Sequence, residues 1–241
     1  MSVADKTVLI TGANRGIGRA LVEEALDRGA RTVYAGVRQP TDFLDSRVTA
    51  LRLDITDAEQ IRSAAGAVAS LDVLINSAGL YGYEDLADRA ALQRHLEVNL
   101  FGPYAITQTF LPRLVESRGA IVNVLSLAAL AALPMTPAYS ISKAAAFSLT
   151  QSLRATLASQ GVDVHAVLPG PVDTDMVRDL EIPKESPRVV ARAIFEALER
   201  GEEDIFPDPF SQSLAESWRA GAVKALERQN ASLLPTGPSD V

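Results

Sequence analysis

A tyrosine and a lysine four positions apart, Tyr139 and Lys143, have the types and spacing that proton-transfer chemistry requires. If the alanine-rich segment around them is helical, the two side chains lie on one face, one turn apart. An ammonium beside a phenol stabilises the phenolate and lowers the tyrosine pKa from about 10 towards neutrality. A phenol tuned in this way acts as a general acid or base near pH 7. Taken alone, the pair is better explained as two ordinary surface residues than as a catalytic pair. The rest of the sequence must decide between these two interpretations.

A serine, Ser126, lies thirteen positions before Tyr139. It follows the apolar, β-branched run from Ile121 to Leu125, which predicts a buried strand. A proline-containing loop leads from this serine to the predicted helix. The serine hydroxyl is therefore expected at the carboxyl end of a strand, where parallel sheets bind their ligands.

The N-terminal segment combines a short strand, a glycine-rich turn and a helix. The β-rich run Thr7 to Thr11 meets the turn Gly12 to Gly18, G-A-N-R-G-I-G, and apolar residues then recur at helical spacing. Such glycines let the backbone approach a pyrophosphate at a helix N-terminus, where amide donors and the helix dipole favour an anion. The spacing G-x-x-x-G-x-G differs from the commonest G-x-G-x-x-G, but its place between strand and helix predicts a dinucleotide-binding unit.

The second predicted strand, Thr32 to Val37, indicates which dinucleotide is bound. Enzymes that hold the adenosine ribose by its 2′-hydroxyl usually carry Asp or Glu near the end of this strand. Here Arg38 stands at that point, and Arg15 lies in the glycine turn. Both arginines could contact a 2′-phosphate through charge-assisted hydrogen bonds. We therefore predict a preference for NADP(H) over NAD(H), with two solvated arginines as the alternative.

Strands alternate with helices along the whole chain, which predicts an α/β fold with a Rossmann-type, doubly wound parallel sheet flanked by helices. We expect one NAD(P)-binding domain over residues 1–241, with a C-terminal helical extension at about 207–232. Right-handed crossovers would gather the turns at the strand ends along one edge. The predicted strands are Thr7 to Thr11, Thr32 to Val37, Val48 to Leu53, Leu71 to Ile75, Ile121 to Leu125, Val162 to Leu168 and Glu203 to Phe206.

Composition narrows the function classes. A formal charge of −7 without a basic run argues against nucleic-acid binding. No apolar run approaches the ~20 residues of a membrane span, and the N-terminus has no signal-peptide pattern, so we expect a cytoplasmic protein. There are no cysteines, and the two histidines, His95 and His165, are far apart, so no metal centre is predicted. We expect His165 within a strand and His95 on a polar helix face, both structural.

Together these motifs closely resemble the short-chain dehydrogenase/reductase family, in its compact, single-domain, carbonyl-reductase-like branch. The resemblance covers residues 5 to about 200 in family order and spacing. It rests on T-G-A-N-R-G-I-G (11–18), N-S-A-G (76–79), Asn99, Ser126, Y-S-I-S-K (139–143) and P-G-P-V-D-T (169–174).

The resemblance implies catalytic roles for Asn99, Ser126, Tyr139 and Lys143. Tyr139 would exchange a proton with a carbonyl or alcohol oxygen, and Ser126 would hydrogen-bond that oxygen. Lys143 would lower the Tyr139 pKa and bind the nicotinamide ribose, while Asn99 would hold a water that links Lys143 to solvent. The implied cofactor-binding residues are Gly12, Asn14, Arg15, Gly16, Ile17, Gly18, Arg38, Asp54, Ile55, Asn76, Ala78, Gly79, Tyr139, Lys143, Pro169, Gly170, Val172 and Thr174.

Two departures from the family pattern affect assembly and substrate. The end of the chain has a helical extension where many members carry a D-G-G-like turn used in a tetramer, so we expect a monomer or homodimer. The segment from Thr174 to Pro187 is short and no cationic cluster is evident, which favours an apolar ketone or aldehyde, or the corresponding alcohol. Candidate wall residues are Tyr81, Tyr83, Leu127, Leu133, Met135, Met176 and Val177.

Two other functions remain open. One is a non-catalytic, NADP(H)-binding regulatory protein on the same fold. The other is a sugar-nucleotide epimerase or dehydratase, which shares a Tyr-x-x-x-Lys pair. The complete set of Ser126, Tyr139 and Lys143 argues against the first, and the short chain after the Pro169 turn leaves little room for the substrate domain of the second.

Overall fold

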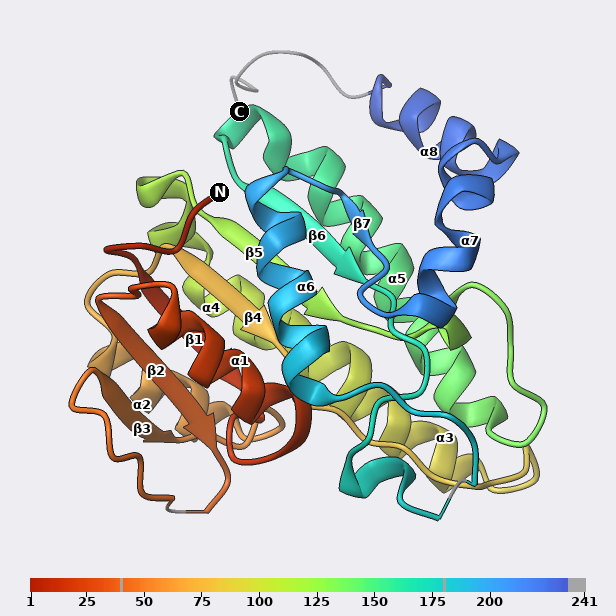
Figure 1. The fold of residues 1–241 in the computed structure, drawn as a ribbon, viewed down its shortest axis with the longest axis horizontal. Coiled ribbons are helices and arrows are strands. Elements are labelled where there is room, and N and C mark those ends of the chain that lie inside the picture. The colour runs from red at the N-terminus through yellow and green to blue at the C-terminus, as the bar shows by residue number, and fades with distance from the viewer. Residues whose placement is uncertain (40, 180, 234–241) are drawn as a thin grey trace.

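Seven parallel strands form one sheet with helices on both faces in the computed structural model, which describes residues 1–39, 41–179 and 181–233 (Figure 1). The strand order is β3-β2-β1-β4-β5-β6-β7. From β1 the next strands are added towards one edge of the sheet, and from β4 onwards towards the other, so the sheet is doubly wound, as predicted. The strands are β1 (Thr7–Thr11), β2 (Thr32–Val37), β3 (Val48–Arg52), β4 (Val73–Asn76), β5 (Ala120–Val124), β6 (Asp163–Val167) and β7 (Asp204–Ile205).

The central strands are buried on both faces, which explains their continuous apolar sequences. Val8 of β1 pairs with Val33 on one side and with Val73 on the other. At the carboxyl ends, Asn76 of β4 lies beside Asn123 of β5. This register aligns the strand ends and brings the turns that follow them to a common edge.

Five helices cover the sheet in two layers (Figure 1). Helices α1 and α6 contact each other and share one apolar core, while apolar residues of α2, α4 and α5 pack in the core on the opposite face. Their bounds are α1 (Gly16–Asp27), α2 (Ala58–Ala67), α4 (Gly102–Ser117), α5 (Pro137–Leu157) and α6 (Pro187–Glu199).

The helical region around Asn99 is interrupted. Helix α3 (Arg89–Leu96) runs into a π-helical turn, Glu97–Phe101, before α4 begins. A π turn inserts one extra residue, and such turns occur frequently at functional sites. The turn moves Asn99 out of the position that a continuous α-helix would give it, and its side chain is buried.

Two further helices follow β7, namely α7 (Pro209–Arg219) and α8 (Ala222–Ala231). The sequence had indicated one helix here, but the helix is interrupted at Gly221, which serves as the N-cap of α8. Residues 234–241 lie outside the described residues. Within the described part of the chain, no helix is long and apolar enough to cross a membrane.

Candidate active site

The turns after β1 and β4 are joined directly. The Thr11 hydroxyl oxygen accepts hydrogen bonds from the backbone N–H groups of Ser77 and Ala78, each at 3.1 Å. A Cβ added to Gly12 would lie 2.8 Å from the Ala78 Cα, so only glycine allows this approach. The glycine turn and the N-S-A-G turn therefore form one rim, as the topology predicted. Thr11 itself was not singled out as a site residue.

The glycine turn has the shape and open donors that a phosphate group requires. Gly16 has a φ of +53°, and a Cβ on Gly18 would lie 2.1 Å from the Gly12 carbonyl oxygen. Arg15 is the N-cap of α1, and among the described residues its side chain makes no capping hydrogen bond. The first amides of α1 thus remain available to an anion. These residues fit a dinucleotide pyrophosphate.

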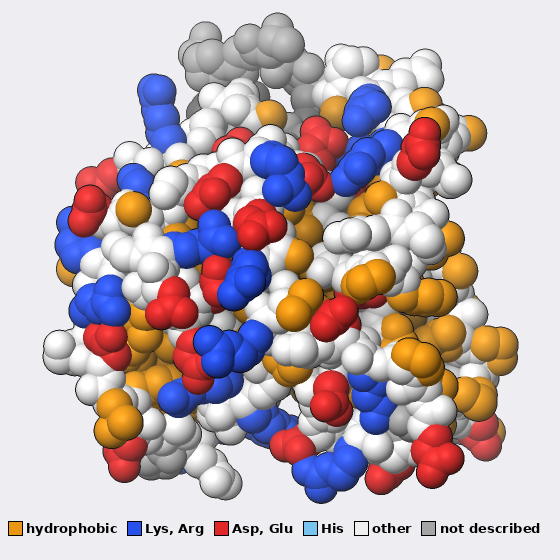
Figure 2. All heavy atoms as spheres, in the orientation of Figure 1, with side chains coloured by type: hydrophobic (Ala, Val, Ile, Leu, Met, Phe, Trp, Pro, Cys, Tyr) orange, Lys and Arg blue, Asp and Glu red, His pale blue; other side chains and the backbone are white. Residues whose placement is uncertain are grey.

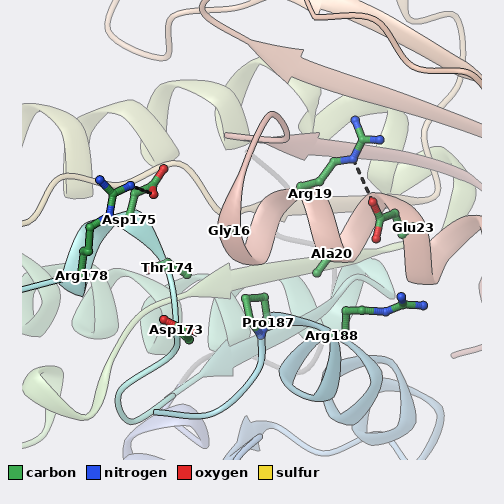
Figure 3. Close-up of a pocket in the computed structure, with 10 residues that line it drawn as sticks. All are labelled: Gly16, Arg19, Ala20, Glu23, Asp173, Thr174, Asp175, Arg178, Pro187 and Arg188. Carbon is green, nitrogen blue, oxygen red and sulfur yellow. Dashed lines mark hydrogen bonds and ion pairs between the residues drawn. The ribbon is translucent and has the colours of Figure 1, made fainter. Parts of the chain in front are cut away.

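A pocket of about 360 Å³ adjoins the glycine turn (Figure 3). Thr174 lies against Gly16, because a Cβ on that glycine would be 3.0 Å from the threonine methyl carbon. The Arg15 guanidinium also points across to this segment and lies 3.6 Å from Asp175. The lining residues are Gly16, Arg19, Ala20, Glu23, Asp173, Thr174, Asp175, Arg178, Pro187 and Arg188.

The remaining predicted cofactor residues differ in exposure. Arg38 follows β2 and is exposed, as a group that meets a phosphate must be. The Asp54 carboxylate accepts hydrogen bonds from the Thr56 N–H and hydroxyl, at 3.0 and 2.7 Å. Ile55 is buried in the apolar core. The Asn76 amide nitrogen bonds the Asn123 side chain at 2.8 Å, while its buried oxygen has no partner among the described residues.

Helix α5 carries Tyr139 and Lys143 on one face, and both side chains are buried. The lysine Nζ lies 5.7 Å from the centroid of the tyrosine ring and donates a hydrogen bond of 2.9 Å to the Val124 carbonyl oxygen. Ser126, two residues after β5, lies near enough to the Tyr139 phenol for its hydroxyl to lower the phenol pKa. The structure therefore brings together the serine, tyrosine and lysine that the sequence singled out.

The expected lowering of the Tyr139 pKa is wrong for this structure. Burial raises the pKa of Tyr139 to about 12, and the hydrogen bond from Ser126 opposes this rise only in part. Burial also lowers the pKa of Lys143 to about 8, because an ammonium loses its hydration there. The phenol is therefore protonated at neutral pH, which suits a proton donor.

Asn99 links the π turn to the N-S-A-G turn and to α5. Its side-chain oxygen accepts from the Leu80 N–H at 2.8 Å, and its nitrogen donates to the Leu80 carbonyl oxygen at 2.9 Å. The same nitrogen donates to the Ser142 hydroxyl at 2.9 Å. A Cβ on Gly79 would lie 3.4 Å from the Asn99 oxygen and 3.7 Å from the Lys143 nitrogen. Asn99 thus lies at the site, with its amide fixed by the backbone.

His95 was expected on a polar helix face, and that expectation is wrong. Its side chain is fully buried, with its ring edge-on to the Tyr139 ring at a centroid distance of 6.2 Å. The Glu84 carboxylate lies 2.9 Å from the His95 Nε2 atom, although the two are not aligned as a hydrogen bond. The spacing of four residues to Asn99 is the signal that sequence reasoning missed. His165, in contrast, is buried in β6 beside the Glu202 carbonyl oxygen, as a structural histidine.

The turn that begins at Pro169 completes the rim. The Leu127 N–H donates to the Pro169 carbonyl oxygen at 3.1 Å, which ties this turn to the segment after Ser126. The Gly170 N–H donates to the buried carboxylate of Asp208 at 2.8 Å. Asp208 also caps α7, so the C-terminal helices are anchored at this turn. Nothing in the sequence had indicated this role for Asp208.

Apolar side chains are exposed around the same end of the molecule. Figure 2 shows acidic and basic groups interspersed over α1 and α6, whereas hydrophobic groups gather on the right of the view, where α7 lies in Figure 1. Of the predicted wall residues, Tyr83, Leu133, Met135 and Met176 are exposed. Phe210 is also exposed, and a Cβ on Gly170 would lie 2.9 Å from its ring.

Comparison with known proteins places these motifs in one family. The family model for short chain dehydrogenases matches residues 6–185. The chain is 35% identical to the Short chain dehydrogenase pigC of Monascus ruber, over 73% of this chain and 65% of that protein. It is 33% identical to Estradiol 17-beta-dehydrogenase 2 of Rattus norvegicus, over 73% of this chain and 51% of that protein. The chain thus spans between about half and two thirds of the length of these relatives.

A solved structure matches nearly the whole chain. It is a short chain dehydrogenase from Burkholderia cenocepacia J2315 in complex with NADP, with a TM-score of 0.87 and 39% identity. The match covers 95% of this chain and 98% of that one, so it includes most of the C-terminal region that follows the family model.

Proposed function

Since this chain belongs to the short-chain dehydrogenase family, we propose that it is an NADPH-dependent oxidoreductase that reduces a ketone or aldehyde to the alcohol. One observation carries the proposal: the buried Tyr139 lies with Ser126 and Lys143 on the rim that also holds the glycine turn. In reverse, the same site would oxidise a secondary alcohol.

Each residue of the site has a distinct task in this reaction. When bound, a reduced nicotinamide supplies the hydride for the carbonyl carbon. The Ser126 hydroxyl donates a hydrogen bond to the carbonyl oxygen, and Tyr139 transfers its phenol proton to that oxygen as negative charge develops. Lys143 then stabilises the phenolate that remains, and its free N–H bonds serve the nicotinamide ribose. Asn99 keeps this end of α5 joined to the Leu80 backbone.

NADP(H) is the proposed cofactor. The solved Burkholderia cenocepacia relative is in complex with NADP. The exposed Arg38 follows β2 directly, at the point where an acid would bind a ribose hydroxyl instead. Arg15 is a second cation on the same rim, with Asp175 as its present partner. The kcat/KM ratio of NADPH to NADH measures this preference. A ratio near one would contradict it.

We also propose an apolar carbonyl compound as substrate and a monomer or homodimer as the assembly. Exposed apolar side chains in the loop before α5 and on α7 support the first proposal. The two helices after β7 support the second, since the family pattern that we described would place a tetramer-forming turn there instead. A panel of ketones and aldehydes, followed by NADPH absorbance, tests the substrate class. Light scattering tests the assembly, and a tetramer would reject our proposal.

The variant Tyr139→Phe tests the proposed chemistry. It keeps the ring that packs in the site but removes the proton, so we expect turnover to fall by about 10³-fold, within the range for a lost general acid. NADPH binding, measured by fluorescence titration, should stay unchanged. Tyr104→Phe is the control, because that phenol is exposed on α4.

The alternative, a non-catalytic NADP(H)-binding regulator, predicts a different result. A regulator would bind NADPH and turn over no member of the carbonyl panel in its wild-type form. Full turnover by Tyr139→Phe would instead show that the protein is an enzyme with another proton donor.

A further inference from the structure

His95 is a buried titratable side chain that the proposed mechanism does not use. It is fully buried, and three groups surround it: the Tyr139 ring, the Asn99 amide and the Glu84 carboxylate. A histidine is seldom buried so completely unless it is hydrogen-bonded. Because two of these groups, Tyr139 and Asn99, belong to the candidate site, the surroundings of His95 point to a role there.

The contacts of His95 join two parts of the site. Its Nδ1 atom lies 3.5 Å from the Asn99 side-chain nitrogen, and its Nε2 atom lies 2.9 Å from the Glu84 carboxylate. If Nε2 carries the proton and faces the carboxylate, the Nδ1 lone pair is left to face the Asn99 amide. One ring thus connects the π turn to the segment 80–84.

The segment 80–84 lies against the catalytic phenol. The Tyr81 ring packs edge-on against the Tyr139 ring at a centroid distance of 5.0 Å, and Tyr83 packs edge-on against Tyr81 at 5.8 Å. The Glu84 side chain folds back over Gly82, where a Cβ would lie 3.2 Å from its carboxylate. Tyr81 therefore lies beside the proton donor, and Tyr83 lies beside Tyr81, in a loop that has no regular structure.

We propose that His95 is a positioning residue that holds the 80–84 segment, through Glu84, against Tyr139 and Asn99, and so shapes the substrate side of the site. This inference rests on the proposed carbonyl reduction. The contact of His95 with Glu84 is short but misaligned. Such contacts in a ligand-free site often become aligned only when the substrate complex forms.

Kinetics of His95→Leu and His95→Gln test the proposal in the full chain. Leucine fills the space without polar atoms, whereas glutamine places an amide near the Nε2 position and still reaches Glu84. We expect His95→Leu to lower kcat/KM about 100-fold, the size of loss that a 1 Å misplacement can cause. The loss should fall mainly on KM, because the 80–84 segment is proposed to shape the substrate side of the site. NADPH affinity should stay within about twofold, and His95→Gln should recover most of the loss. A loss of less than twofold in a folded His95→Leu protein, or no recovery with glutamine, would overturn the proposal.

The control is His165→Leu, which replaces the other buried histidine at a distance from the site, on β6. It should lower thermal stability without a selective rise in KM. If His165→Leu raises KM as much as His95→Leu does, the effect is a general consequence of losing a buried histidine and the proposal fails.

A double-mutant cycle tests the partner. Glu84→Ala should raise KM as His95→Leu does, and the double variant should be no worse than either single one, because both remove the same link. Independent, multiplicative losses would overturn the role assigned to Glu84.

Amide hydrogen exchange gives a readout that needs no turnover. The Leu80 N–H is bonded to Asn99, so residues 80–84 should exchange faster in His95→Leu than in wild type or His165→Leu. If wild type reduces no carbonyl compound, the proposed function fails. Amide exchange then still tests whether His95 holds the 80–84 segment in place. If wild type is active and exchange is unchanged by His95→Leu, only this inference fails.

Discussion

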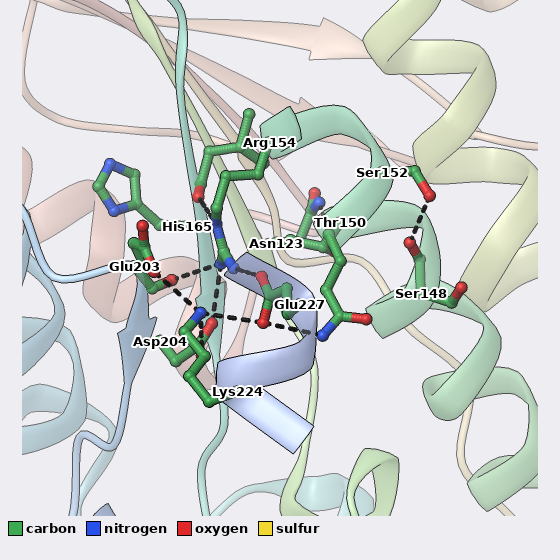
Figure 4. Close-up of polar contacts among 12 residues, drawn as sticks. Asn123, Ser148, Thr150, Ser152, Arg154, His165, Glu203, Asp204, Lys224 and Glu227 are labelled. Atoms are coloured by element: carbon green, nitrogen blue, oxygen red, sulfur yellow. Dashed lines mark hydrogen bonds and ion pairs between the residues drawn. The ribbon is translucent and has the colours of Figure 1, made fainter. Parts of the chain in front are cut away.

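Two lysines are buried in the part of the chain that the structure describes, and their surroundings are opposite. Lys143 is 6% exposed and its ammonium has one hydrogen-bond acceptor, the Val124 carbonyl oxygen, with no carboxylate in ion-pair distance among the described residues. Lys224 is 2% exposed and lies within 3.0 Å of three carboxylates (Figure 4). Those carboxylates belong to Glu203, Asp204 and Glu227.

The Lys224 cluster joins the C-terminal helix to the sheet. Arg154 of α5 bonds Asp204 at 2.8 Å and also pairs with Glu227 of α8. Trp218 of α7 donates its indole N–H to Asp204 at 2.8 Å. Burial by itself raises the pKa of Asp204, but these cations and the indole hold it below its usual value. Each buried charge in the cluster is balanced, so we interpret the cluster as structural.

Lys143 has surroundings that are unfavourable for stability and typical of a functional group. A buried charge is unfavourable unless a partner compensates for it, and perturbed groups of this kind gather at functional sites. Within residues 1–39, 41–179 and 181–233, Lys143 has no acidic partner that would hold its charge in place. Its ammonium therefore remains free to act on a neighbouring phenolate, whereas the Lys224 ammonium is fully engaged.

Replacing each lysine by methionine should affect turnover in one case and stability in the other. We expect Lys143→Met to lower turnover by about 10³-fold without lowering stability, because it removes an unpaired buried charge. Lys224→Met should lower the free energy of unfolding by about 3–5 kcal/mol, because three carboxylates lose a shared cation. Urea denaturation and kcat per folded molecule measure the two effects. Equal stability losses in both variants would remove the distinction.

The second-largest expected effect is a pH dependence of the free energy of unfolding that is due to Lys143. Below pH 8 the folded protein bears the cost of burying the Lys143 ammonium, whose pKa of about 8 compares with 10.5 in the unfolded chain. Between these values only the unfolded chain holds the proton, so the free energy of unfolding rises with pH. At about 1.4 kcal/mol per pKa unit, the full rise is on the order of 3 kcal/mol.

The comparison of wild type with Lys143→Met isolates this contribution. From pH 8 through 9 to 10, the free energy of unfolding of wild type should rise relative to that of Lys143→Met. Higher pH adds the opposite contribution of Tyr139, whose folded pKa of about 12 lies above its unfolded value. An equal slope in both proteins between pH 8 and 10 would mean that Lys143 is not the group responsible.

The sequence predicted the parts of this site that depend on local patterns. Tyr139 and Lys143 share a helix face because of their spacing, and the glycine turn follows from a strand and a helix at its two ends. The parallel sheet and the common edge of its turns follow from the alternation of elements. These features are set by periodic or short-range sequence patterns and do not depend on which distant segments come into contact.

The parts that the sequence did not predict depend on contacts between distant segments. The π turn shifts the helix by one residue at Asn99, and no apolar periodicity marks it. His95 is polar in type but buried, because the loop with Glu84 covers it. Asp208 reaches Gly170 over 38 residues of chain. The Tyr139 pKa differs from the expectation because burial, which the sequence does not reveal, raises it more than the Ser126 hydroxyl lowers it.

The smallest expected effect concerns Trp218, at the edge of the Lys224 cluster. Trp218→Phe keeps an aromatic ring against Phe147, whose centroid lies 5.7 Å from that of the indole, but removes the N–H that bonds Asp204. Because Lys224 and Arg154 still bond that carboxylate, we expect a loss of about 1 kcal/mol in the free energy of unfolding, the value of one hydrogen bond.

The same substitution in the Lys224→Met background shows whether the cluster acts as a unit. With the ammonium gone, Asp204 depends more on the indole N–H, so the loss from Trp218→Phe should exceed its value in wild type. Turnover should be unchanged in either background, since Asp204 is not part of the proposed active site. Additive losses would mean that the cluster is a set of independent contacts. A fall in kcat would mean that α7, which Asp208 anchors to Gly170, transmits the change to the active site and that the two buried lysines are not separate systems.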